Sequence, residues 1–166
     1  MALKKTSEII AIGFSVSESA PNTFAQTQVD LQLNPLDQEV FVVVAIDLDP
    51  FAPDAVANTN TSTLMSLSTT SRSSFGNLST SSVLANSVLD IRADAVNHVS
   101  FTRTSLDSPP AALEYIGIIS TNDFFVQLQG NNNVNQKDGF GRVWGYRARA
   151  DAATYAALVQ SEILSS

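Results

Sequence analysis

Short runs of β-branched and aromatic residues, separated by turn-forming residues, dominate this sequence. They recur at spacings of about 8–15 residues, without the helical segments that a βαβ chain would place between them. Such runs predict strands, and the missing strand–helix alternation argues against a parallel α/β sheet. The predicted strands span residues 9–16, 23–33, 39–48, 61–70, 83–92, 96–104, 113–120, 124–129 and 142–148.

The run at residues 39–48 differs from the others because it is apolar on both faces. Val40 and Val42 alternate with Phe41 and Val43, so that neither face offers water a polar surface. Such a strand is expected at the centre of a sheet, or covered on both sides.

The end of the chain has a helical rather than a strand-like composition. Asp151 is a suitable N-cap for a helix over residues 151–164. Five residues fall on the stripe expected to pack: Ala152, Tyr155, Ala156, Val159 and Ile163.

The strand runs and the single short helix together predict an all-β fold for the chain of 166 residues. We expect one domain over residues 1–166, a jelly-roll-like antiparallel β-sandwich with an N-terminal arm at 1–8 and a short C-terminal α-helix.

The segment 115–150 carries the clearest local pattern. Its two β-rich runs, 124–129 and 142–148, flank a stretch of Asn, Gln, Lys, Asp and Gly at 131–138. This pattern predicts a hairpin with a long polar tip. Amide side chains suit contact surfaces better than proton transfer, so the tip is predicted to make interactions through Asn131, Asn132 and Asn133.

Two glycines, at positions 139 and 141, precede the last strand run, and a third, Gly145, lies within it. A dinucleotide-binding loop has its glycines between a strand and a helix, and these enter a strand. We therefore interpret them as permitting a bulge or a close approach of two backbones.

Charged residues make up only 15% of the chain, against a typical share of about 25%. Ser, Thr, Asn and Gln take their place, which favours a surface covered by neighbouring subunits. A monomer with a Ser/Thr-rich β surface is the alternative.

The net charge of −7 argues against strong direct binding of nucleic acid, which needs an excess of Lys and Arg. No cysteine is present, which excludes disulfides and zinc–thiolate sites. No secretory signal is recognisable, and no run approaches the ~20 apolar residues of a membrane span.

Asp47, Asp49 and Asp54 form the one acidic cluster that could hold Ca²⁺. The sequence IDLDPFAPD lacks the glycine and the closing glutamate of an EF-hand loop. Turn formation by Asp ahead of Pro is the favoured interpretation. We therefore predict no metal and no cofactor.

Catalytic residues are not predicted in this chain. His98 and Asp94 could belong to a Ser-His-Asp triad, but the sequence contains no G-x-S-x-G motif. A solvent-facing strand histidine is the favoured interpretation. Two of the carboxylates of Asp90, Asp94, Glu114 and Asp123 could in principle hydrolyse a glycoside, but a single tryptophan gives no Trp-rich cleft.

Basic and aromatic residues alternate at the end of the last strand run. Strand parity places Arg142, Trp144 and Tyr146 on one face and Arg147 and Arg149 on the other. A split cluster is a poor groove for a nucleic acid strand, so pairing of the arginines with acids, across strands or between subunits, is favoured. The interaction residues predicted outside the polar tip are Trp144, Tyr146, Arg147, Arg149 and Tyr155.

In strand count, in length and in the stretch IGIISTNDFFVQLQGNNN…GRVWGYRARAD, the chain resembles small single jelly-roll coat proteins of tailless or marine viruses. The resemblance implies a virion shell protein that assembles as trimers or pseudo-hexameric capsomers in the host cytoplasm. Its partners would be copies of itself and other virion proteins. The acidic balance departs from coats that bind a naked genome through basic arms. No site residues carry over.

Two alternatives remain open. One is a carbohydrate- or receptor-binding β-sandwich on a fibre or virion surface, with Trp144, Tyr146 and residues 131–135 as its site. The other, ranked last, is a hydrolase that uses His98 or the carboxylates. The order of expectation is shell subunit, binding module, enzyme.

Overall fold

The computed structural model of the chain describes residues 3–105 and 113–164. These residues form strands, one α-helix and one short 3₁₀ helix: β1 (Leu3–Lys5), β2 (Ile10–Ser17), β3 (Ala25–Asp30), η1 (Pro35–Asp37), β4 (Glu39–Pro50), β5 (Thr61–Ser68), β6 (Val83–Ala93), β7 (His98–Thr104), β8 (Gly117–Ile119), β9 (Asp123–Asn131), β10 (Asp138–Ala150) and α1 (Ala152–Leu164). Each predicted strand overlaps an observed one, and the all-β class with a short C-terminal helix is confirmed. The predicted strand at 113–120 shortens to β8, and residues 3–5 of the predicted arm form β1 against β10.

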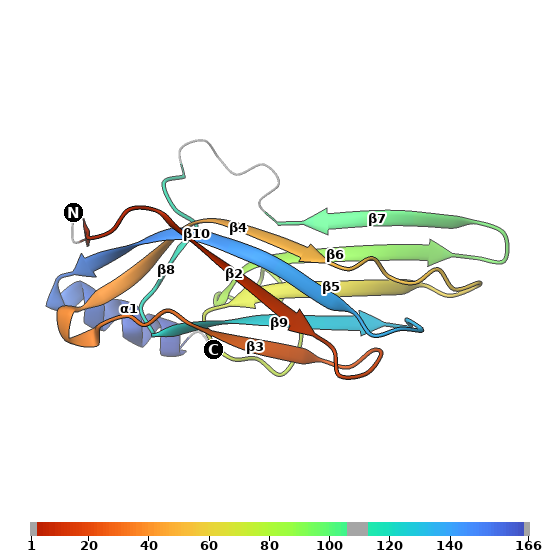
Figure 1. The fold of residues 1–166 in the computed structure, drawn as a ribbon, viewed down its shortest axis with the longest axis horizontal. Coiled ribbons are helices and arrows are strands. Elements are labelled where there is room, and N and C mark those ends of the chain that lie inside the picture. Colours follow the sequence, from red (N-terminus) through yellow and green to blue (C-terminus); the bar gives the residue numbers. More distant parts are fainter. Residues whose placement is uncertain (1–2, 106–112, 165–166) are drawn as a thin grey trace.

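The strands form two antiparallel sheets that pack face to face (Figure 1). Sheet A has the order β1–β10–β4–β8, with β2 also paired to β10, and sheet B has the order β3–β9–β5–β6–β7. Without β1 and β7, the remaining strands can be numbered one to eight along the chain. The sheets then read 1-8-3-6 and 2-7-4-5. First pairs with eighth, second with seventh, third with sixth and fourth with fifth, which is the strand order of a jelly roll.

The predicted hairpin between residues 124–129 and 142–148 is wrong. β9 belongs to sheet B, where it pairs with β3 and β5, whereas β10 belongs to sheet A, where it pairs with β2 and β4. Residues 132–137 therefore cross from one sheet to the other. Alternation of apolar residues fixes which face of a strand is buried, but it leaves the pairing partner undetermined.

Strand β4 is central and covered on both faces, as its apolar pattern predicts. It lies between β10 and β8 in sheet A. Phe41 and Val43 point into the core between the sheets. Val40 and Val42 point the other way and pack against Leu158 of helix α1. The helix therefore gives the outer face of sheet A an apolar layer of its own.

A bulge interrupts the pairing of β10 with β4 between Trp144 and Gly145. A Cβ atom at Gly145 would lie 2.4 Å from the carbonyl oxygen of Val42 and 2.6 Å from the ring of Phe41. Only glycine leaves room for this approach, so the prediction of a bulge or close backbone approach is confirmed here.

Helix α1 begins where the sequence predicts. The Asp151 carboxylate accepts a hydrogen bond from the backbone N–H of Thr154 over 2.7 Å, as an N-cap does. This hydrogen bond holds the pKa of Asp151 below its usual value. The helix then packs through Tyr155, Leu158 and Glu162.

The predicted packing stripe of α1 is wrong in part. Ala152, Ala156 and Ile163 are exposed, and the deepest residue is Glu162. Its carboxylate accepts hydrogen bonds from the backbone N–H and the hydroxyl of Ser120, over 2.8 and 2.7 Å. Glutamate is a polar residue type, so the predicted stripe omits Glu162 and includes its neighbour Ile163 instead.

The outer face of sheet B is covered by the Ser-rich segment 69–82. Ser66 and Ser68 point to this face, where the amide of the buried Gln127 bonds both hydroxyls over 2.8 Å. The backbone N–H of Gly76 donates to Ser66 Oγ over 3.2 Å. Part of the neutral polar composition therefore serves internal hydrogen bonding rather than contacts with neighbours.

Candidate interaction surfaces

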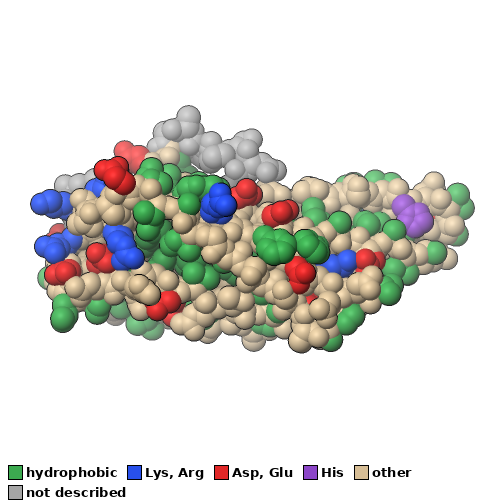
Figure 2. Space-filling model, in the orientation of Figure 1, with side chains coloured by type: hydrophobic (Ala, Val, Ile, Leu, Met, Phe, Trp, Pro, Cys, Tyr) green, Lys and Arg blue, Asp and Glu red, His purple; other side chains and the backbone are tan. Residues whose placement is uncertain are grey.

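A shallow hollow of about 210 Å³ on the outer face of sheet A collects charged and aromatic side chains. The hollow is lined by Asp47 and Asp49 of β4 and by Phe140, Gly141, Arg142 and Trp144 of β10. Strand pairing sets Arg142 opposite Asp47 and Phe140 opposite Asp49. The Arg142 guanidinium lies 5.8 Å from the centroid of the Trp144 ring. Figure 2 shows the molecule from the side of sheet A, with apolar and acidic side chains next to one another on its surface.

The row of outward side chains continues along β10 beyond the hollow. Tyr146 packs in the cluster that α1 covers, and the Lys5 ammonium lies 5.1 Å from the centroid of its ring. The predicted grouping of Arg142, Trp144 and Tyr146 on one strand face is therefore confirmed. Both residues are partly buried, but Trp144 lines the hollow whereas Tyr146 packs in the cluster under α1, so Trp144 is the better placed of the two to meet a ligand.

The three weak metal candidates do not come together. Asp47 and Asp49 both line the hollow. Asp54 lies in a different part of the fold, where its carboxylate forms an ion pair with the Lys137 ammonium over 2.7 Å. Within residues 3–105 and 113–164, no group of three or more metal-ligating side chains could hold an ion.

The Asn-rich loop that follows β9 is fastened to the rest of the chain. Asn133 is only 6% exposed, and its amide donates to the Ser62 carbonyl oxygen over 2.9 Å. Asn131 and Asn132 are exposed, but their amides donate to the Ser62 hydroxyl and to the Asn60 carbonyl oxygen. The prediction of an outer contact is wrong for the buried Asn133, and it stays a prediction for Asn131 and Asn132.

Two carboxylates from distant parts of the chain shape this loop. Buried Glu18 accepts hydrogen bonds from the backbone N–H groups of Gly130 and Lys137, over 3.0 and 2.8 Å. Asp54 accepts from the Lys137 ammonium and from the backbone N–H of Asn135. These two bonds hold the pKa of Asp54 below its usual value, with Lys137 as the larger cause. Nothing in the sequence indicated Glu18, because its partners are backbone groups more than a hundred residues away.

We expect Asp54→Asn to lower the free energy of unfolding by about 3 kcal/mol at neutral pH, because it leaves the buried Lys137 ammonium unpaired. The folded-state pKa of Asp54 is lowered, so its contribution is complete above the usual value of about 3.9 and is lost as the pH falls further. Urea unfolding at neutral pH and at about pH 3 measures the difference between wild type and variant, which should shrink in acid.

The exposed Asp47 offers a matched control for this prediction. Asp47→Asn should change stability by no more than about 0.5 kcal/mol at either pH. An Asp54→Asn variant as stable as wild type at neutral pH would show that the Lys137 ion pair does not hold the loop.

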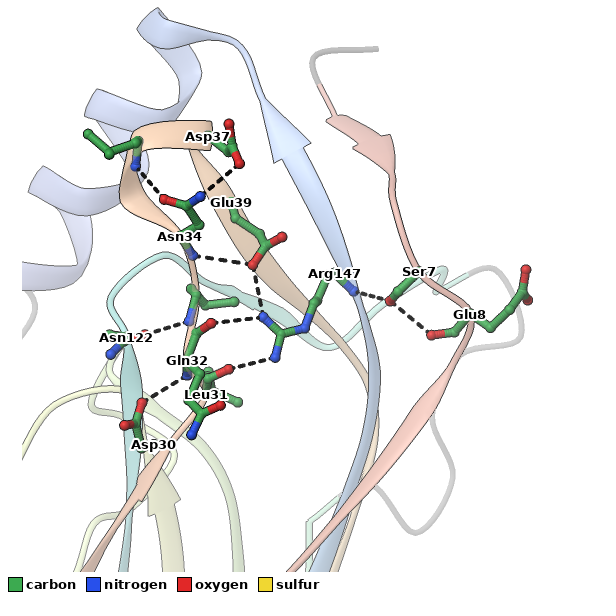
Figure 3. A network of polar contacts seen from close by, with 12 residues as sticks. Ser7, Glu8, Asp30, Leu31, Gln32, Asn34, Asp37, Glu39, Asn122 and Arg147 are labelled. Atoms are coloured by element: carbon green, nitrogen blue, oxygen red, sulfur yellow. Dashed lines mark hydrogen bonds and ion pairs between the residues drawn. The ribbon is translucent and has the colours of Figure 1, made fainter.

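Arg147 ties sheet A to the segment that leaves sheet B (Figure 3). Its guanidinium donates to the carbonyl oxygens of Leu31 and Gln32, over 2.8 and 3.1 Å, and to Glu39 Oε1 over 2.8 Å. Gln32 has a left-handed backbone conformation, with φ at 54°. The arginine therefore satisfies the carbonyls of a strained turn, which is a role within the fold.

Arg149 forms an ion pair with Asp37 over 3.3 Å, and both side chains are about half exposed. Pairing with acids, the favoured interpretation of these arginines, is confirmed within the chain for Arg147 and Arg149. Any additional contact of Arg149 with a neighbouring molecule stays a prediction.

His98 lies on the exposed strand β7, as the interpretation of a solvent-facing strand histidine predicts. Asp94 accepts hydrogen bonds from the backbone N–H groups of Val96 and Asn97, which holds its pKa below the usual value and shapes the turn before β7. Asp90 pairs with Arg103 over 3.2 Å. These acids thus have roles in a turn and in strand pairing.

Helix α1 presents an apolar groove of about 490 Å³ on its outer side. The groove is lined by Tyr155, Ala156, Val159, Gln160, Ile163 and Leu164. A second hollow, of about 320 Å³, lies on the other side of Tyr155 and Val159, against Leu33, Pro35 and residues 120–122. Tyr155, a predicted interaction residue, borders both. Apolar surface of this kind suits contact with another protein chain.

Comparison with known proteins gives little further information. No protein family model and no curated protein matches the chain. Among solved structures, the chain is similar to the tailspike protein gp49 of the Acinetobacter baumannii bacteriophage Fri1, a capsular polysaccharide depolymerase. The identity is 10% over 73% of this chain and 20% of that chain, with a TM-score of 0.17. A match of this quality carries no functional implication. In the part of the chain described, no helix is long and apolar enough to span a membrane.

Proposed function

We propose that this chain is a structural virion protein, a self-assembling capsid or shell subunit put together in the host cytoplasm. The observation that supports this proposal is the jelly-roll strand order of the two sheets. Virus capsid proteins are prominent among the proteins built on this architecture, together with lectins and cupins. One architecture serves several functions, so the choice among them depends on the surface.

The surface favours assembly. Large apolar side chains stay exposed on strand β7, at η1 and along α1, among them Phe101, Leu36 and Leu164. Along α1 these side chains line the apolar groove, and contact with a neighbouring subunit would bury this surface. The net charge of −7 does not suit direct contact with a genome, because binding to phosphates needs an excess of Lys and Arg.

The test is the mass of the purified protein by light scattering over a range of concentrations, with negative-stain imaging of the same samples. Trimers, hexamers, sheets or shells are the expected result. A monomer at every concentration and ionic strength would contradict self-assembly.

A second candidate function is sugar binding at the hollow on sheet A. Trp144 offers an aromatic face, and Arg142, Asp47 and Asp49 offer charged hydrogen-bonding groups beside it. This site differs from the one the sequence indicated, since Asn133 of the polar loop is buried.

If the hollow binds a glycan, Trp144→Ala should weaken binding by about thirtyfold, because truncation of a central aromatic side chain at an interface costs about 2 kcal/mol. A glycan array followed by titration calorimetry measures the change. Leu78→Ala, at an exposed apolar residue of the loop between β5 and β6, is the control and should bind as wild type. Equal binding by the Trp144 variant would exclude the hollow as the sugar site.

A further inference from the structure

Strand β7 is an addition to the eight strands of the jelly roll, and it forms the last strand of sheet B. It pairs only with β6 among the strands described, and it lies along the upper edge of the view in Figure 1. Six of its seven residues are exposed, so sheet A covers neither of its faces. Val99 and Phe101 are half exposed. A strand in this position invites pairing with another chain.

The hydrogen-bonding direction of each β7 residue follows from two bonds that flank the β6–β7 ladder. The N–H of Asp94 donates to the carbonyl oxygen of Asn97, and the N–H of Ser105 donates to that of Asn86. Hydrogen-bonded and non-hydrogen-bonded pairs alternate along an antiparallel ladder. The odd-numbered residues 99, 101 and 103 therefore bond to β6. The backbone groups of His98, Ser100, Thr102 and Thr104 point to the free edge.

The residues of β7 itself lack the features that commonly prevent pairing. β7 contains no proline, no lysine and no bulge. Its one arginine, Arg103, is paired with Asp90 of β6 over 3.2 Å. The side chains at the edge are hydroxyls, one imidazole and two exposed apolar groups, none of which repels a second strand.

We propose that β7 pairs antiparallel with β7 of a second copy of this chain, which joins two B sheets across a two-fold axis. In the inferred register His98 lies opposite Thr104 and Ser100 opposite Thr102 of the other copy. All four outward-pointing residues of each strand are then bonded, and Phe101 faces its own counterpart. The inference rests on the proposed function, because it names one contact through which the subunit assembles.

The side chains favour a second copy in this one register. Phe101 meets Phe101 and Val99 meets the aliphatic stem of Arg103, so no like charges stand directly opposite one another. A shift of two residues leaves outward groups unpaired and separates the phenylalanines. A shift of one residue turns the side chains to the wrong face. A two-fold contact of this kind is isologous and closes on itself.

Cysteine substitution tests the register, since the natural chain contains no cysteine. Residue 101 would form a non-hydrogen-bonded pair with itself, with Cα atoms about 4.5 Å apart, which a disulfide can bridge. Phe101→Cys should give a disulfide-linked dimer on mild oxidation. Val99→Cys is the control, because residue 99 lies about 13 Å along the strand from its counterpart, and it should stay uncross-linked.

A second pair of variants tests the contact without cross-linking. Thr102→Pro removes an N–H that points to the free edge and no bond to β6, and Phe101→Lys sets two ammonium groups opposite each other. Each should weaken dimer formation by at least about tenfold in light scattering or sedimentation, with circular dichroism and melting close to wild type.

The outcomes separate this contact from the wider function. If the wild-type protein forms larger assemblies but the Phe101→Cys variant gives no disulfide-linked dimer, the β7 contact is overturned and self-assembly is still supported. Equal cross-linking at positions 99 and 101 would also overturn it. Cross-linking at position 101 but not at position 99 supports the contact. If the protein then forms dimers and no larger assemblies under any condition, the proposal of a shell subunit is contradicted. Pairing of β7 with a different protein in place of itself would overturn the self-contact.

Discussion

Val42→Asp is expected to yield no folded protein. Val42 has no exposed surface. Its side chain lies on the outer face of sheet A, under helix α1, and packs in a cluster with Val40, Ala148 and Leu158. An unpaired carboxylate at this position costs about 5 kcal/mol or more, which is comparable to the whole stability of a domain of this kind, about 5–15 kcal/mol. The soluble yield, circular dichroism and urea unfolding of the purified variant measure the outcome.

Two further variants separate burial from the chemical change itself. Val96→Asp places the same carboxylate on a residue that is 84% exposed, in the turn before β7, and should fold as wild type. Val42→Ala removes two methyl groups without a charge and should cost about 2 kcal/mol. A Val42→Asp variant that folds and unfolds like wild type would show that α1 does not seal the outer face of β4.

The central position of β4 could be predicted because both of its faces are apolar, a property that depends on single residues and their neighbours. The same holds for the start of α1, where Asp151 caps the helix within three residues of its own position. Local patterns of this kind contain all the information that the prediction needs. They explain why the strands and the helix were placed close to their observed positions.

Pairing between strands depends on contacts that are distant in sequence. The runs that become β9 and β10 have the composition of a hairpin, yet each strand pairs within a different sheet. Glu18 and Asp54, from distant parts of the chain, also accept hydrogen bonds from the connecting loop. A carboxylate in a loop has no periodicity that would reveal such a role.

The same distinction between local patterns and contacts distant in sequence applies to the predicted interaction residues. Strand parity correctly grouped Arg142 with Trp144, because parity is local to one strand. The role of Arg147 was only partly predictable, since its carbonyl partners on Leu31 and Gln32 lie in a turn that the sequence did not place beside β10. The free edge of β7 could not be predicted, because the sequence shows the strand without showing which of its sides has no neighbour among the described strands.

Removal of residues 152–166 is expected to destabilise the chain by about 3–6 kcal/mol. Truncation removes the partly buried Tyr155 and Leu158 and uncovers the fully buried Val40 and Val42. Full burial of a large apolar side chain contributes about 1.5–3 kcal/mol. The truncated chain should also expose an apolar strip on sheet A, so we expect it to aggregate without order in place of regular assembly. Urea unfolding and light scattering of the truncated and full-length chains measure both effects.

The contribution of Glu162 can be separated from that of the apolar face. Its carboxylate accepts the backbone N–H and the hydroxyl of Ser120, and it also bonds Thr121, so Glu162→Gln keeps the shape and removes the charge. We expect this variant to lose about 1.5–3 kcal/mol, the usual range for hydrogen bonds to a charged group. Gln160→Ala, on the exposed side of the helix, is the control and should change stability by less than about 0.5 kcal/mol. If truncation and Glu162→Gln both leave the unfolding midpoint unchanged, α1 does not stabilise the isolated subunit. The helix would then be expected to pack against a neighbouring subunit instead, through the groove that Tyr155 and Val159 border.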